Sequence, residues 1–183
     1  MIFTKLYSFE NRCNIIIYKY NMIPNPLILY KKNPKKIYSS YGIPFECVEL
    51  VRRYFTLYYG LTFPSIPDAF DMFSSINSLI HINTNQVILL ETVNSQNVDD
   101  LRVGDILFWK RNRSNTNYGH VAIVVRAIKG KVAIAQQNMD DLVEEYNVFD
   151  IIRAMNRKNS QFLGIKRLPK FIPTPARIPI EKK

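Results

Sequence analysis

Hydrophobic residues recur at helical spacing between Tyr41 and Gly60 of this 183-residue chain. One side of the predicted helix carries Cys47, Val51, Tyr54, Phe55 and Tyr58. The other side carries Glu49, Arg52, Arg53 and Thr56. Gly42 and Pro44 disfavour helix just before Cys47. Because glycine is also a typical residue after a helix C-terminus, the pattern predicts a helix that begins at or beside Cys47 and ends at Gly60.

The second half of the chain has the alternation and the β-branched content of strands. Strands are predicted at residues 106–110 (ILFWK), 121–128 (VAIVVRAI), 132–138 (VAIAQQN) and 162–167. Residues 129–131, KGK, form a tight turn, so the two middle strands pair antiparallel. Consecutive strands of this kind imply a meander. A further strand is predicted at residues 14–20, NIIIYKY.

The remaining segments give the domain organisation. The predicted division is 1–13 as a weakly patterned N-terminal extension, 14–167 as one domain, and 168–183 as a proline-rich basic tail. Pro64 and Pro67 interrupt the chain before residues 68–76, where a short helix is expected with Asp68 as its cap. Residues 83–97 and 140–156 have mixed patterns that predict no single element.

Composition and charge exclude several classes of protein. A content of 47% hydrophobic and 13% aromatic residues is not that of a disordered chain. The formal net charge of +10 is compatible with an acidic partner such as nucleic acid, an anionic membrane surface or a cell-wall polymer. The basic residues lie in small scattered groups without interleaved aromatic residues, which favours general solvation over specific nucleic-acid binding.

Two cysteines, Cys13 and Cys47, cannot form the disulfide framework of a small secreted domain. The sequence shows no signal peptide and no apolar run of spanning length. These features predict a cytoplasmic protein in a reducing compartment. The oligomeric state is left open.

Cys47 is a candidate nucleophile because of its place at the start of the predicted helix. Unpaired backbone N–H groups and the positive end of the helix dipole favour a thiolate at that position. The alternative is that Cys47 is a small buried hydrophobic residue.

His120 is the candidate base for this nucleophile. It opens a predicted strand directly after Gly119, whose missing side chain would let a substrate come close. Gln136 and Asn138 lie on the next strand, so one of them is expected to face His120 and to hold its tautomer. The alternative is a structural histidine at a strand edge, with polar residues at the end of the neighbouring strand.

A metal or cofactor is not predicted. Cys13, Cys47, His81 and His120 are the only cysteines and histidines, and their spacing matches no zinc motif, so His81 is taken as structural. The sequence has no glycine-rich phosphate loop and no GxSxG elbow.

Four motifs in order, FECVELVRRYF, VGDILFW, GHVAIVV and VAIAQQN, resemble the CHAP domain family of cysteine, histidine-dependent amidohydrolases and peptidases. Within the family they are most similar to the amidase domain of glutathionylspermidine and trypanothione synthetases. The resemblance runs from about residue 14 to residue 167. It implies a papain-like α+β fold, in which a nucleophile-bearing helix packs on an antiparallel β-sheet.

The resemblance also implies roles for individual residues. Cys47 matches the family's nucleophile, His120 its general base and Asn138 its asparagine. Gln136 stands where the family has a glutamate, and Glu46 stands where close relatives have glutamine. A neutral amide still accepts a hydrogen bond from imidazole, but it does not stabilise imidazolium by charge. The side chain of Glu46 is expected to point away from the oxyanion, with the backbone N–H of Cys47 as one oxyanion donor.

The leading functional prediction is therefore a cofactor-free cysteine amidase or peptidase that acts through a thioester. Its expected substrate is a small peptide or a peptide–polyamine amide similar to glutathionylspermidine. One alternative is hydrolysis of peptidoglycan stem peptides or cross-bridges, with the positive charge aiding adsorption to the wall. Another is a catalytically inactive binding module that uses the same cleft.

Overall fold

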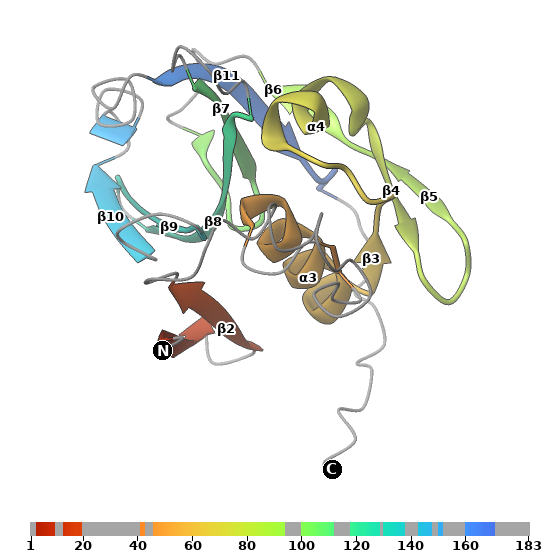
Figure 1. The fold of residues 1–183 in the computed structure, drawn as a ribbon, viewed down its shortest axis with the longest axis horizontal. Coiled ribbons are helices and arrows are strands. Elements are labelled where there is room, and N and C mark those ends of the chain that lie inside the picture. Colours follow the sequence, from red (N-terminus) through yellow and green to blue (C-terminus); the bar gives the residue numbers. More distant parts are fainter. Residues whose placement is uncertain are drawn as a thin grey trace, which may run out of the picture.

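The computed structural model describes residues 3–9, 13–19, 41–42, 46–93, 100–111, 118–128, 130–137, 143–147, 150–151 and 160–170. Over these residues the chain forms helices α3 and α4 and three antiparallel sheets (Figure 1). This arrangement confirms the predicted α+β class. None of the helices in these ranges has the length and apolar character needed to cross a membrane.

Helix α3 (Cys47–Tyr59) begins and ends where its sequence predicts. Glu46 precedes it in an extended conformation, with φ −88° and ψ 153°. Gly60 ends it in the left-handed region at φ 67°, where its N–H reaches the carbonyls of Phe55 and Thr56. A residue with a Cβ is strained at this φ, so glycine is the expected residue at this place.

The largest sheet has six strands. In spatial order they are β10 (Val143–Asn147), β9 (Lys131–Ala135), β8 (His120–Ile128), β7 (Ile106–Arg111), β11 (Ser160–Arg167) and β6 (Glu91–Val93). Strands β7 to β10 follow one another in chain order, which confirms the meander. Strand β11 crosses over to lie between β7 and β6.

Side chains alternate between the two faces of this sheet, as expected for buried strands. On β8, Val121, Ile123 and Val125 pack in the same core as helices α3 and α4. Ala122 and Val124 belong to a second apolar cluster on the other face. Helix α3 therefore lies against one face of the sheet and contacts both β8 and the short strand β3 (Figure 1).

A second, three-stranded sheet follows α3 in the chain. It consists of β3 (Leu61–Thr62), β4 (Ser78–His81) and β5 (Val87–Leu89). Between β3 and β4 lies α4 (Ala69–Ser75), whose cap is Asp68 as predicted: its side chain accepts a hydrogen bond from the N–H of Asp71 at 2.8 Å.

Some segments differ from the sequence-based expectation. Residues 1–13 are predicted to be a weakly patterned extension with no strand, and here β1 (Phe3–Phe9) pairs antiparallel with β2 (Cys13–Lys19). The mixed segments 83–97 and 140–156 contain β5, β6 and β10. Short strands of this kind have little periodicity of their own, because pairing with distant partners stabilises them.

Candidate active site

Cys47 is the first residue of α3 and is buried, with 8% of its surface exposed. The first amides of a helix have no carbonyl partner within the helix, and Cys47 stands at this end of α3. The cap residue Glu46 makes no side-chain hydrogen bond to these amides. This environment favours negative charge on the sulfur.

His120 is the first residue of β8 and is 2% exposed. Its Nε2 lies 3.0 Å from Oε1 of Gln136, the residue that follows β9. An amide oxygen only accepts hydrogen bonds, so this contact favours the tautomer with the proton on Nε2. The lone pair is then on Nδ1, the nitrogen that can take a proton from a thiol. Of the two predicted partners, the structure brings Gln136 to His120, and Asn138 lies outside the described residues.

Gly119 is a glycine for a reason other than the expected one. Its φ is +65°, and a Cβ at this position would lie 2.8 Å from the carbonyl oxygen of Trp109 and 2.9 Å from the amide nitrogen of Phe70. The protein's own backbone therefore fills the position that a Cβ would take, and close approach of a substrate to Gly119 stays a prediction. The neighbouring carbonyl of Tyr118 accepts hydrogen bonds from the N–H groups of Ala69 and Phe70, which fixes the start of α4 beside His120.

Part of the predicted polar side of α3 is buried. Glu49 and Arg53 are only 3% and 7% exposed, although the sequence places them opposite the apolar side. They form an ion pair, with Arg53 Nε 2.7 Å from Glu49 Oε1. The i,i+4 spacing is the sequence signal for such a pair, but it carries no information about burial.

Gln137 forms hydrogen bonds with both members of this buried ion pair. Its Nε2 donates to the backbone carbonyl of Glu46 at 3.0 Å and to Glu49 Oε2 at 2.9 Å. Its Oε1 accepts from Arg53 Nη2 at 3.2 Å. Gln137 is fully buried, although its sequence context is only that of a polar residue at a strand end.

Together these contacts connect the two candidate catalytic residues. Gln137 bonds to the residue before Cys47, and Gln136, the next residue along the backbone, contacts His120. A short series of hydrogen bonds and peptide bonds thus runs from the start of α3 to the imidazole.

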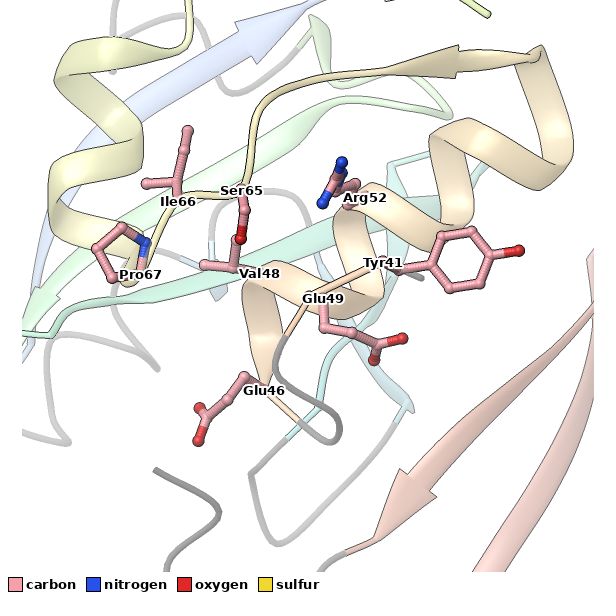
Figure 2. A pocket seen from close by; sticks show the side chains of 9 residues that line it. Tyr41, Glu46, Val48, Glu49, Arg52, Ser65, Ile66 and Pro67 are labelled. Atoms are coloured by element: carbon pink, nitrogen blue, oxygen red, sulfur yellow. The ribbon is translucent and has the colours of Figure 1, made fainter. Parts of the chain in front are cut away.

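A pocket opens beside the first turns of α3 (Figure 2). It is lined by Tyr41, Gly42, Glu46, Val48, Glu49, Arg52, Ser65, Ile66 and Pro67. Its charged lining residues are two acidic ones, Glu46 and Glu49, and one basic one, Arg52. Arg52 is partly exposed, and its Nε donates to Thr62 Oγ1 at 3.3 Å. Of the residues predicted to bind substrate, Glu46 lines this pocket and Gly119 does not.

Within the described ranges, no group of three or more histidine, cysteine or acidic residues is arranged to hold a metal ion. His81 accepts a hydrogen bond at Nδ1 from the N–H of Thr84, 3.3 Å away, within the turn after β4.

Comparison with known proteins identifies related sequences. The CHAP domain family matches residues 37–138, a range that includes Cys47, His120 and Gln136. The chain is 30% identical over 98 residues to the bifunctional glutathionylspermidine synthetase/amidase of Escherichia coli (strain K12) and to that of Shigella flexneri. Each of these matches covers 54% of this chain and 16% of the relative.

A third relative is the glutathionylspermidine synthase of Crithidia fasciculata, which is 29% identical over 105 residues. That match covers 57% of this chain and 14% of the relative. All three matches therefore span a small part of the length of these relatives.

Proposed function

The chain belongs to the CHAP domain family, and from this premise we propose that it is a cysteine amidohydrolase with Cys47 as nucleophile and His120 as general base. The observation that carries the proposal is the hydrogen-bonded connection from the start of α3 through Gln137 and Gln136 to His120. It supports a nucleophile and a base held at one end of the sheet, with a third polar group on the imidazole, which is the arrangement that cysteine hydrolases use.

The proposed reaction has two halves. In the first, His120 takes the proton of the Cys47 thiol, and the sulfur attacks the carbonyl carbon of an amide. The imidazolium then gives its proton to the leaving amine nitrogen, the C–N bond breaks, and a thioester remains. In the second, His120 takes a proton from water, and the resulting hydroxide displaces the sulfur. The acyl group leaves as a carboxylic acid, and the thiol is restored.

The surrounding groups have supporting roles in this mechanism. Gln136 holds the Nε2–H tautomer, so that Nδ1 is the basic nitrogen. The backbone N–H of Cys47 is one donor to the oxyanion of the tetrahedral intermediate. Glu46 lies in the pocket lining, where its charge acts on the substrate.

We propose a peptide–polyamine amide as the substrate. The names of two relatives combine an amidase with glutathionylspermidine, a conjugate of a tripeptide and a polyamine. Such a molecule carries a carboxylate and several ammonium groups. The polar residues beside α3 match this chemistry, because Arg52 suits a carboxylate and Glu46 suits an ammonium group.

Alkylation of Cys47 by iodoacetamide between about pH 5 and 9, followed by peptide mass mapping, tests the catalytic pair. We expect rapid labelling of Cys47 well below the ordinary thiol pKa of about 8.5, and slower labelling in His120→Ala. Labelling of Cys47 only in the ordinary thiol range, and without dependence on His120, would contradict the proposal and favour a binding module.

Hydrolysis of amides provides the second part of the test. Cys47→Ala should abolish release of amine from a glutathionylspermidine-like conjugate, while the circular dichroism spectrum stays that of the wild type. Full hydrolysis by this variant would rule out Cys47 as the nucleophile. Activity on peptidoglycan stem peptides in place of the conjugate would keep the mechanism and replace the substrate.

A further inference from the structure

Both N–H groups and the oxygen of the Gln137 amide form hydrogen bonds within one buried site. Both N–H bonds donate, one to Glu46 O and one to Glu49 Oε2, and the oxygen accepts from Arg53. A flipped amide would place its oxygen against two acceptors and its nitrogen against a donor. The orientation of this side chain is therefore determined by its three partners.

Stability alone does not account for this network. Removing the charges of Glu49 and Arg53 from water is costly, and well-packed apolar residues often stabilise such a site as well or better. The network lies at the end of β9, where the same backbone segment also contacts His120. This location indicates that the network positions residues of the candidate active site.

We propose that Gln137 is a positioning residue, which fixes the start of α3 relative to Gln136 and thereby the Cys47 thiol relative to the His120 imidazole. This inference rests on the proposed function. Thiol-to-imidazole proton transfer needs hydrogen-bond distance, and a displacement of about 1 Å can lower a rate about a hundredfold. The hydrogen bonds described for Gln137 reach the backbone of Glu46 on one side, and its peptide bond joins it to Gln136 on the other.

Arg53 also compensates the negative charge of Glu49 near Cys47. Glu49 lies two residues after Cys47 in the first turn of α3, and an uncompensated carboxylate there would oppose a thiolate. The ion pair with Arg53 compensates this charge, and the same guanidinium holds Gln137 Oε1. Positioning and charge compensation therefore depend on one buried group.

The test is the pH profile of Cys47 alkylation in Gln137→Met, which keeps a similar length without hydrogen-bonding groups. We expect the labelling rate at neutral pH to fall by about tenfold to a hundredfold. The midpoint of the profile should also move toward that of an ordinary thiol, near pH 8.5. A purely structural role would lower the denaturant midpoint and leave the pH profile of the folded protein unchanged.

Asp105→Asn is the matched control for lost stability. Asp105 belongs to a different buried ion pair, with Arg167, and has no contact with α3 among the interactions described above. This variant should lower the denaturant midpoint and retain the wild-type alkylation profile. If Gln137→Met does not fold, Arg53→Lys gives the same test, because one ammonium keeps the positive charge but cannot reproduce the fork that holds Glu49 and Gln137.

The outcomes separate this inference from the proposed function. Slow, ordinary labelling of Cys47 in the wild-type protein would overturn the proposed function and the inference with it. Rapid wild-type labelling with an unchanged rate and midpoint in folded Gln137→Met, or in Arg53→Lys, would overturn the inference alone. A loss in these variants that Asp105→Asn does not share would support it.

Discussion

At the scale of a single residue, the neutral side chain of Gln136 affects how strongly the imidazolium form of His120 is stabilised. It is fully buried, and its Oε1 faces Nε2 of His120 at 3.0 Å. A neutral amide selects the tautomer of the imidazole but adds little to the stability of the imidazolium, whereas a carboxylate does both. The protonated form of His120 is therefore less favoured in this chain than it would be beside a glutamate.

Gln136→Glu is expected to make imidazolium persist to higher pH. An opposite charge at this distance raises the pKa of a base by about 1–3 units. The alkaline limb of the pH–rate profile should therefore move to higher pH. The only tryptophan, Trp109, has its ring centroid 6.1 Å from that of His120, and imidazolium quenches indole emission more strongly than imidazole does. A fluorescence titration therefore provides a second measurement of the same shift.

His120→Ala is the control for this titration, because the quenching step should disappear in that background. An alkaline limb and a fluorescence midpoint that both stay at the wild-type values would mean that residue 136 does not interact with His120 in solution.

At the scale of an element, helix α4 supports the strand that begins with His120. Its first two N–H groups bond to Tyr118 O, and the backbones of Phe70 and Trp109 occupy the space beside Gly119. The position of His120 therefore depends on close backbone contact between α4, β7 and the start of β8. Only a residue without a Cβ permits this contact.

Gly119→Ala should disturb this contact and lower both stability and activity. The added Cβ would lie less than 3 Å from two backbone atoms and would also strain a φ of +65°, so we expect a loss of about 1–3 kcal/mol or more in the free energy of unfolding. Urea denaturation measures this loss, and amide hydrolysis measures the displacement of His120.

Gly130→Ala is the matched control for Gly119→Ala. Gly130 has a similar φ of +76°, but a Cβ there meets no atom within 4 Å. It isolates the backbone strain and should leave hydrolysis unchanged. Equal effects of the two substitutions would show that crowding beside His120 is unimportant.

At the scale of the whole molecule, β11 places the last described strand of the chain in the large sheet, between β7 and the edge strand β6. Arg167, its last residue, binds Asp105 with two hydrogen bonds of 2.8 and 2.7 Å. The hydrogen bonds to Asp105 raise the pKa of Arg167, which means that folding favours the charged form. A raised pKa on a base contributes its full stabilisation below the unfolded value, so the contribution is undiminished at neutral pH.

Asp105→Asn should reduce the free energy of unfolding by about 3–5 kcal/mol, because it removes the buried partner of Arg167. The guanidinium then keeps only the exposed carboxylate of Asp100, 3.1 Å from its Nη1, as a counter-charge. Denaturant unfolding at neutral pH measures the loss. A change below about 1 kcal/mol would place this pair among weak surface ion pairs, despite the 1% exposure of Asp105.

The sequence by itself determined the elements whose signals are local. Helix α3 begins at Cys47 and stops at Gly60, α4 follows the cap Asp68, and β7, β8, β9 and β11 lie close to their predicted positions. Caps, glycine stops and periodicity act within a few residues, so they can be read without knowledge of the fold. Four sequence motifs in order indicated the CHAP domain family, and the predicted hairpin of β8 and β9 identified Gln136 as one of two candidate partners of His120.

Only the tertiary structure decided which polar residues are inside. Gln137 is separated by 88 positions from Glu49 and by 84 from Arg53, and no local pattern relates residues so far apart. Their burial follows from the packing of α3 against the large sheet, which brings it beside the residues that follow β9. Each polar group gains a partner there, and this makes its burial tolerable. For the same reason the crossover of β11, and the backbone contact that requires Gly119, emerge only from the packed molecule.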